Sequence, residues 1–298
     1  MRFLNCFIVN KISGNGRALR VWNQIEKRLQ EKNVNYCVRF TQKPKHATSI
    51  VQELISKEKV NVIVVVGGDG TIHEVINGLI GNNIPLGIIP AGSGNDFSRG
   101  LGISLNPDKA LDRILNDEPQ MIDIGLIDST YFGTVTGIGF DGKVAHVVNN
   151  SIQKKIFNLV RMGHLSYIIS AMKVLFQYSP TDLSIVIDNK LYNFQKVWLI
   201  AVANLPFYGG GMIICPKAKS NDGLFDICIV QGMTKFEFLR IFPLVFKGMH
   251  ISSPSVKIMK GKEIEIHSPT PLMIHGDGEM MGQTPVRIRI EPCALHVK

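Results

Sequence analysis

Two patterns of hydrophobic and polar residues divide the chain. In the first part, short apolar runs alternate with segments in which apolar residues recur every three or four positions. The spacing predicts helices over residues 19–29, 50–55 and 72–80, and the runs predict strands at residues 6–9, 34–40, 60–66 and 85–89. Strands that alternate with helices are typical of a parallel sheet covered on both faces. We therefore expect an α/β domain over residues 1–122.

The second part of the chain is richer in strand patterns. Turns join strand-like segments at residues 124–140, 183–187, 197–203, 224–230, 263–266 and 286–290. One helical region, residues 143–176, interrupts this series. The pattern predicts a β-rich, antiparallel and sandwich-like domain over residues 123–298. It leaves open whether the last strand returns to the first domain.

The composition excludes several classes of protein. Of the 298 residues, 45% are hydrophobic and 19% are charged, which is too apolar for a disordered chain. The chain has 33 Lys and Arg against 24 Asp and Glu, and its formal charge of +9 favours an anionic partner. Five scattered cysteines without a C-x-x-C pair argue against a disulfide framework or a structural zinc site. The same cysteine pattern indicates a reducing compartment, so we expect a cytoplasmic protein. Since no run of 18 apolar residues is present, we expect no membrane-spanning segment.

Three glycine loops follow strands of the predicted sheet, at residues 10–16, 67–71 and 90–95. Glycine lets backbone N–H groups approach a phosphate closely, and a helix that starts after the loop adds its positive N-terminal end. Because the carboxyl ends of parallel strands meet at one edge of a sheet, we expect the loops to converge. Asp69 in the second loop adds a carboxylate that can hold magnesium directly or through water.

Two of these loops resemble known signatures. Residues 67–74, Gly-Gly-Asp-Gly-Thr-Ile-His-Glu, are similar to the nucleotide-binding signature of the diacylglycerol kinase catalytic domain, although NAD kinases share the Gly-Gly-Asp-Gly core. Residues 90–99, Pro-Ala-Gly-Ser-Gly-Asn-Asp-Phe-Ser-Arg, resemble the lipid-kinase version of a second signature. The family order also matches at residues 10–16, 139–142, 221–226 and 275–279. The resemblance covers essentially the whole chain and is closest to the small soluble bacterial lipid kinases.

The resemblance implies a Rossmann-like nucleotide-binding domain, a β-rich lipid-binding domain and ATP between them. It assigns the carboxylate base to Glu279. It also assigns a structural magnesium site to Asp222 and to main-chain oxygens near Lys219 and Leu224. The residues that it places around ATP are Asn10, Ser13, Gly14, Thr41, Gly68, Asp69, Gly70, Thr71, His73, Glu74 and Ser93.

Apart from the resemblance, the carboxylates near the C-terminal end of the chain suit phosphoryl transfer to an alcohol. A lipid hydroxyl is a poor nucleophile at neutral pH, and a positioned carboxylate that accepts its proton contributes about 10²–10⁴-fold. Glu279 follows a predicted hairpin tip, and Asp277 beside it can support a metal or Glu279. We favour Glu279 as the base, with Asp69 next. The alternative is that Asp277, Glu279 and Asp222 are plain turn residues.

These features predict an ATP- and magnesium-dependent lipid kinase that transfers the γ-phosphoryl group to a lipid hydroxyl. Diacylglycerol or a related glycerolipid is the first choice of acceptor. One alternative is an NAD kinase-like phosphotransferase, which shares residues 67–71, and another is a non-catalytic nucleotide-binding regulator at the membrane. A nucleic-acid partner is not expected, because no recognised binding motif is present. The sequence is compatible with a homodimer but does not decide the oligomeric state.

Contact with the lipid substrate is expected to be peripheral, at the membrane surface, because the sequence shows no anchor. Basic side chains near an anionic surface contribute about 1 kcal/mol each. The alternative is an ordinary amphipathic helix packed on its own sheet. The candidate residues for membrane contact are Lys154, Lys155, Arg161 and Lys173, with Phe157, Leu159, Val160, Leu165, Tyr167, Ile168 and Ile169.

Overall fold

The structure is a computed structural model, and it describes residues 4–150 and 172–298. Contacts divide the chain into two units. The first unit is formed by Met1–Asp123 and Pro292–Lys298, and the second by Ile124–Glu291. The last strand, β17 (Val286–Val297), therefore begins in the second unit and ends in the first, where Val297 pairs in parallel with Leu86.

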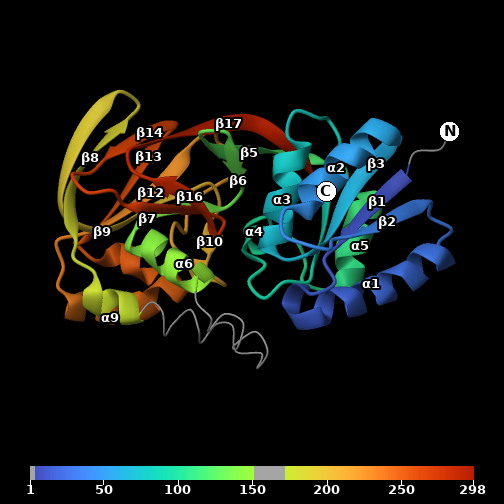
Figure 1. Ribbon diagram of the computed structural model, residues 1–298, viewed down its shortest axis with the longest axis horizontal. Helices are drawn as coiled ribbons and strands as arrows, with labels where there is room; N and C mark the ends of the chain where they lie inside the picture. Colours follow the sequence, from blue (N-terminus) through green and yellow to red (C-terminus); the bar gives the residue numbers. More distant parts are fainter. Residues whose placement is uncertain (1–3, 151–171) are drawn as a thin grey trace. The chain divides into compact units, whose positions relative to one another are not determined.

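The first unit is a parallel sheet with helices on both faces. Its strands follow the order β4-β3-β1-β2, and each neighbouring pair is parallel. Helix α1 packs with α5 and α2 packs with α3, and Figure 1 shows the two pairs on opposite faces of the sheet. The elements are β1 (Leu4–Val9), α1 (Ser13–Glu31), β2 (Tyr36–Phe40), α2 (His46–Lys57), β3 (Val60–Gly67), α3 (Asp69–Leu79), β4 (Leu86–Pro90), α4 (Asp96–Gly100) and α5 (Pro107–Asn116).

Strand β3 shows why the chain adopts this arrangement. Seven of its eight residues are buried and only Asn61 is exposed, since helices cover the sheet on both sides. The amphipathic helices supply that cover, and α1 buries Ala18, Val21, Trp22 and Ile25. Leu19, which the periodicity placed on the buried face, is 37% exposed.

The second unit is an antiparallel β structure built around one long strand, β9, which pairs with β7, β8 and β12. Strands β14 and β17 extend it beyond β8, and β15 and β16 extend it beyond β7. The elements are β5 (Gln120–Ile127), β6 (Thr130–Phe132), β7 (Val135–Gly139), α6 (Phe140–Asn150), β8 (Thr181–Ile187), β9 (Lys190–Ala203), β10 (Phe207–Tyr208), β11 (Met212–Ile213), β12 (Phe225–Gln231), α9 (Lys235–Ile241), the 3-10 helices η1 (Phe242–Lys247) and η2 (Met249–Ser252), β13 (Val256–Gly261), β14 (Glu263–His267), β15 (Met273–Gly276) and β16 (Glu279–Gln283).

Two hydrophobic cores lie on the two faces of this sheet. Along β9, Ala201 and Ala203 belong to one core, and Ile200 and Val202 belong to the other. This is the two-residue alternation of a pleated strand, and both sets are apolar because both faces are buried. The first core also includes Phe238 of α9 and residues of α6 and η1, so these helices cover one face of the sheet.

The helical content of the second half was under-predicted. A single helical region at residues 143–176 was expected, but α9, η1 and η2 add helical turns between residues 235 and 252. A signal for α9 was present, since Thr234 and Glu237 form a capping box at its start. The strand-like segment at residues 124–140 is also divided, into β5, β6 and β7.

The basic and apolar residues proposed for membrane contact fall mainly outside the described part of the chain. Residues 154–169 are not described, whereas Lys173 is described and exposed. Within residues 4–150 and 172–298, none of the helices combines the length and the apolar character that a bilayer crossing requires.

Candidate active site

The three glycine loops of the first unit come together at the carboxyl ends of β1, β3 and β4. Asn10 after β1 donates a hydrogen bond from Nδ2 to Oγ1 of Thr71, at 2.9 Å. A β-carbon on Gly68 would lie 2.8 Å from the Cα of Gly92 and 3.2 Å from Oγ of Ser13. The loops are therefore in backbone contact, and the expected convergence of these residues is observed.

Glycine is required at two of these contacts. Gly14 has a φ of +58°, and a β-carbon there would overlap the carbonyl oxygen of Ala91. A β-carbon on Gly92 would overlap the Cα of Gly68. Two side chains brace the same junction, Asn95 of the third predicted loop and Arg17, which sequence reasoning missed. Arg17 donates hydrogen bonds to the carbonyl oxygens of Ala91 and Gly92, and Asn95 exchanges hydrogen bonds of 2.8 and 3.0 Å with the backbone of Gly92.

Helix α3 starts within this junction, at Asp69. The first N–H groups of a helix have no partner within it, and its macrodipole places partial positive charge there. Asp69 Oδ1 accepts a hydrogen bond of 3.1 Å from the backbone N–H of Phe97, which ties the start of α4 to the start of α3. Gly70 and Ser93 are exposed, so the loop surface is accessible from solvent. Such a surface can bind the phosphates of a nucleotide.

Three other residues predicted to contact the nucleotide, Thr41, His73 and Glu74, lie around this junction. The carboxylate of Glu74 accepts hydrogen bonds from the backbone N–H groups of Lys45, at 2.8 Å, and Ala47, at 2.9 Å, at the start of α2. Thr41 continues β2, and its N–H donates to the carbonyl of Val9. His73 is buried in α3. Glu74 thus caps a helix in this structure, and nucleotide contact by these three residues stays a prediction.

In the second unit, the hairpin of β15 and β16 presents Asp277 and Glu279 at its tip. The Asp277 carboxylate accepts three hydrogen bonds, from the N–H groups of Gly133 and Thr134, both at 2.8 Å, and from the Thr134 hydroxyl at 2.6 Å. It therefore fastens the turn to the segment between β6 and β7. Glu279 is exposed, and no described residue forms a hydrogen bond or an ion pair with its side chain. The turn therefore presents one fixed carboxylate and one accessible carboxylate.

A buried pair, His275 and Asp141, contacts the backbone of this turn. Nε2 of His275 lies 3.1 Å from Oδ2 of Asp141, and both side chains are 5% exposed. The backbone N–H of Gly278 donates to Nδ1 of His275 at 3.3 Å, so Nε2 carries the proton and donates to Asp141. A β-carbon on Gly137 would overlap both polar atoms, and the Tyr208 ring stacks on the imidazole with centroids 6.4 Å apart. The pair fixes the backbone just before Glu279.

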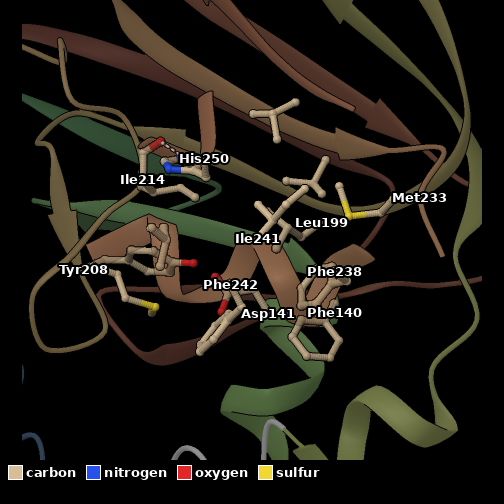
Figure 2. A pocket seen from close by; sticks show the side chains of 14 residues that line it. Phe140, Asp141, Leu199, Tyr208, Ile214, Met233, Phe238, Ile241, Phe242 and His250 are labelled. Carbon is tan, nitrogen blue, oxygen red and sulfur yellow. Dashed lines mark hydrogen bonds between the residues drawn. The ribbon is translucent and has the colours of Figure 1, made fainter. Parts of the chain in front are cut away.

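An apolar pocket lies beside this pair, between the sheet and the helices α9 and η1. Figure 2 shows Phe238, Ile241 and Phe242 facing its interior, with Asp141 at one side. Its free volume is about 50 Å³, which is enough for several waters, yet nearly all of its lining is apolar. The lining residues are Phe140, Asp141, Leu199, Tyr208, Met212, Ile214, Val230, Met233, Phe238, Ile241, Phe242, Val245, His250 and Val256. Such a pocket favours an apolar group over water.

We expect His250 in the pocket wall to make the stability of this unit depend on pH. Its Nε2 donates to the carbonyl of Ile214 at 3.0 Å, and burial lowers the pKa of the imidazole. The unfolded chain then binds a proton that the folded chain excludes, so stability is lost as pH falls below about 6.5. Urea unfolding should show this loss in the wild type and a smaller one in His250→Gln. Equal losses in the two proteins would assign the pH dependence to other groups.

One of the three residues expected at the structural magnesium site, Asp222, pairs with a lysine in this structure. Asp222 Oδ1 accepts a hydrogen bond of 3.1 Å from the N–H of Leu224, and Oδ2 lies 3.1 Å from the Lys260 ammonium. Lys260 also lies 3.2 Å from Oδ2 of Asp226, which is 2% exposed. Burial raises the pKa of Asp226, and Lys260 acts against that rise. In this structure Lys260 neutralises Asp222, and the magnesium site of Lys219, Asp222 and Leu224 stays a prediction.

Replacing Lys260 should therefore destabilise the second unit. In Lys260→Met the buried Asp226 loses its cation, and because Lys260 itself is 43% exposed we expect a loss of about 1–3 kcal/mol in the free energy of unfolding. Magnesium should restore part of this loss in the variant, while magnesium and EDTA leave the wild type unchanged. Thermal unfolding of both proteins measures these effects. A wild type that EDTA destabilises would show instead that the carboxylates hold a metal ion.

Comparisons with known proteins give a consistent result over the whole chain. Residues 5–127 match the model of the diacylglycerol kinase catalytic domain, and residues 134–298 match that of the YegS C-terminal NAD kinase beta sandwich-like domain. The chain is 32% identical to the protein named "Putative lipid kinase YtlR" from Bacillus subtilis, over 98% of each chain. It is 30% identical to a diacylglycerol kinase from Mycobacterium tuberculosis, over 97% of this chain and 93% of that one. A solved structure of a "putative diacylglycerol kinase" from Bacillus anthracis has a TM-score of 0.81 at 26% identity, over 99% of this chain and 94% of that one.

Proposed function

The chain belongs to the diacylglycerol kinase catalytic-domain family of lipid kinases, and from this premise we propose that it transfers the γ-phosphoryl group of ATP to a lipid hydroxyl. The favoured acceptor is diacylglycerol or a related glycerolipid. Relatives at 30–32% identity carry lipid kinase or diacylglycerol kinase names, which favours this class of acceptor.

The observation that carries the proposal is the apolar pocket beside the acidic turn. Asp141 and Tyr208 line the pocket, and the same two residues contact His275. His275 precedes Glu279 by four residues on the same hairpin. An apolar portion of a lipid held in the pocket would place the lipid beside the hairpin that carries the acidic turn. A soluble dinucleotide such as NAD has no comparable apolar group, so the pocket supports the lipid over NAD.

The residues of the chain suit a phosphoryl transfer to an alcohol. In our proposal, the glycine loops and the start of α3 bind the phosphates of ATP through backbone N–H groups. The accessible Glu279 carboxylate accepts the proton of the lipid hydroxyl as the hydroxyl oxygen attacks the γ-phosphorus, the bond from that phosphorus to the β–γ bridging oxygen breaks, and ADP leaves. Asp277 and the His275–Asp141 pair hold the turn from which Glu279 projects. Magnesium that accompanies ATP supplies neutralisation of the phosphate charge when it is bound.

The experiment that tests the proposal offers two acceptors to the purified protein. With ATP labelled at the γ-position and magnesium, detergent-dispersed diacylglycerol and NAD are supplied side by side. We expect label in the lipid and none in NAD. Label in NAD alone would support the NAD kinase-like alternative. Binding of ATP without transfer to either acceptor would support a nucleotide-binding regulator.

A substitution in the pocket wall should affect long-chain lipids more than short-chain lipids. Val230→Phe places a ring into the pocket wall, where little free volume remains. We expect kcat/KM for long-chain diacylglycerol to fall about tenfold or more relative to a short-chain diacylglycerol, because only the long chain needs the filled space. Kinetics with the two acceptors measure this ratio, and the short-chain rate is the control for folding. An unchanged ratio would place the lipid chain elsewhere.

A further inference from the structure

The outer face of the pocket's helical wall carries an unusual set of exposed side chains. Helices α9 and η1 follow one another directly, and their inward residues Phe238, Ile241, Phe242 and Val245 line the pocket. Facing solvent on the same two helices and on η2 are Phe236, which is 74% exposed, Leu244 at 37%, Phe246 at 47% and Met249 at 56%. Exposed apolar side chains in such a group are typical of an interaction site.

A second aromatic segment adjoins this face. The Lys235 ammonium donates a hydrogen bond of 2.6 Å to the carbonyl oxygen of Phe176, and Phe176 is 66% exposed. At the other end, the Phe246 ring contacts the pocket-lining Phe242 edge-on, with centroids 6.2 Å apart. We group the exposed side chains of Phe176, Phe236, Phe246, Leu244 and Met249 on these adjoining segments and call them the docking face.

The charges on this face are almost all positive. Lys173, Lys235, Arg240 and Lys247 are exposed on the same helical segments. The one carboxylate between residues 235 and 252 belongs to Glu237, which is engaged in the capping box, accepting hydrogen bonds of 2.7 and 2.8 Å from the N–H and hydroxyl of Thr234. This segment combines exposed aromatic rings with cations and has no free carboxylate. It therefore complements a surface that has anionic groups outside and an apolar layer beneath them.

We propose that this docking face binds the surface of an anionic lipid bilayer. This inference rests on the proposed function in one respect: docking would bring the apolar pocket to the bilayer that contains the lipid substrate. Aromatic side chains partition into the interface of a bilayer, where their rings replace water by headgroup and acyl contacts. Each nearby Lys or Arg adds attraction to anionic headgroups, and this attraction weakens as salt screens it. Because the same helices form the pocket wall, docking places the pocket directly behind the membrane contact.

Sedimentation with vesicles tests the docking face. Wild-type protein and the variant F236S/F246S are mixed with vesicles of phosphatidylcholine that contain phosphatidylglycerol, and with vesicles of phosphatidylcholine alone. The control variant is Leu191→Ser, which removes an apolar side chain that is 60% exposed on β9. We expect the wild type and Leu191→Ser to bind the anionic vesicles equally, F236S/F246S to bind about tenfold more weakly, and salt to reduce the wild-type binding.

Two readouts separate the failure of this inference from failure of the proposed function. Transfer to diacylglycerol dispersed in detergent needs no docking, so F236S/F246S should keep the wild-type rate there. If the wild type phosphorylates dispersed lipid but F236S/F246S binds vesicles as well as the wild type, the docking face is wrong and the kinase proposal stands. If the wild type binds neutral and anionic vesicles equally at every salt concentration, the proposed attraction between the basic side chains and anionic headgroups is wrong. If vesicle binding depends on Phe236 and Phe246 while no lipid is phosphorylated, the docking face stands and the proposed function fails.

Discussion

Glu279→Gln should lower the turnover of lipid phosphorylation by about 10²–10⁴-fold, the range expected for loss of a general base. The amide keeps the size and shape of the side chain but cannot accept the hydroxyl proton. Glu279 is exposed at the start of β16 and has no partner among the described residues, so its loss should leave the free energy of unfolding unchanged. The affinity for ATP, measured by calorimetry, should also stay at the wild-type value, because the glycine loops lie in the other unit.

Two comparisons show whether Glu279 itself is responsible. Glu118→Gln removes an exposed carboxylate from the first unit and should turn over normally. Asp277→Asn weakens the three hydrogen bonds that fasten the turn, and it should reduce turnover and stability together. Near-normal turnover in Glu279→Gln would assign the proton acceptor to another carboxylate, with Asp69 the next candidate.

The second large effect is expected at the junction of the glycine loops. A β-carbon in Gly92→Ala would overlap the Cα of Gly68, and backbone atoms cannot yield as a flexible side chain can. Separating the loops should cost about 1–3 kcal/mol in the free energy of unfolding. It should also displace backbone donors to phosphate, each worth about 1.5–3 kcal/mol, so the Kd for ATP should rise at least about tenfold.

Gly81→Ala is the matched control for this substitution. Gly81 has a φ of +87° and open space around it, so alanine there introduces backbone strain without a clash and away from the loops. Unfolding experiments and ATP titrations on both variants separate the two effects. We expect Gly81→Ala to lose stability but retain ATP affinity. Wild-type ATP affinity in Gly92→Ala would mean that the loop junction does not bind the nucleotide.

The first unit could be predicted well from the sequence because its signals are local. The β-branched run of β3 and the helical spacing after Asp69 lie within single elements, and parallel-sheet geometry then places the loops together. The resemblance supplied the roles that patterns alone leave open. The bracing by Arg17 was missed, because a lone arginine at the start of a helix carries no pattern that points to a loop 75 residues away.

The second unit was harder because its site depends on distant contacts. Asp277 takes its hydrogen bonds from residues 143 and 144 positions earlier, and His275 meets Asp141 across 134 positions. In the sequence both residues have the pattern of ordinary turn and strand positions. The apolar pocket was also not predicted, since the α9 capping box was overlooked and its aromatic residues are ordinary core residues by pattern.

Transfer of phosphate to a lipid hydroxyl can be observed by mass spectrometry of a total bacterial lipid extract incubated with the protein, ATP and magnesium. Omission of ATP and use of Glu279→Gln serve as controls. We expect a new phosphorylated lipid that appears only with the wild type and ATP, with a diacylglycerol-type lipid depleted in proportion. An unchanged lipid profile from protein that is folded and binds ATP would contradict the proposed transfer.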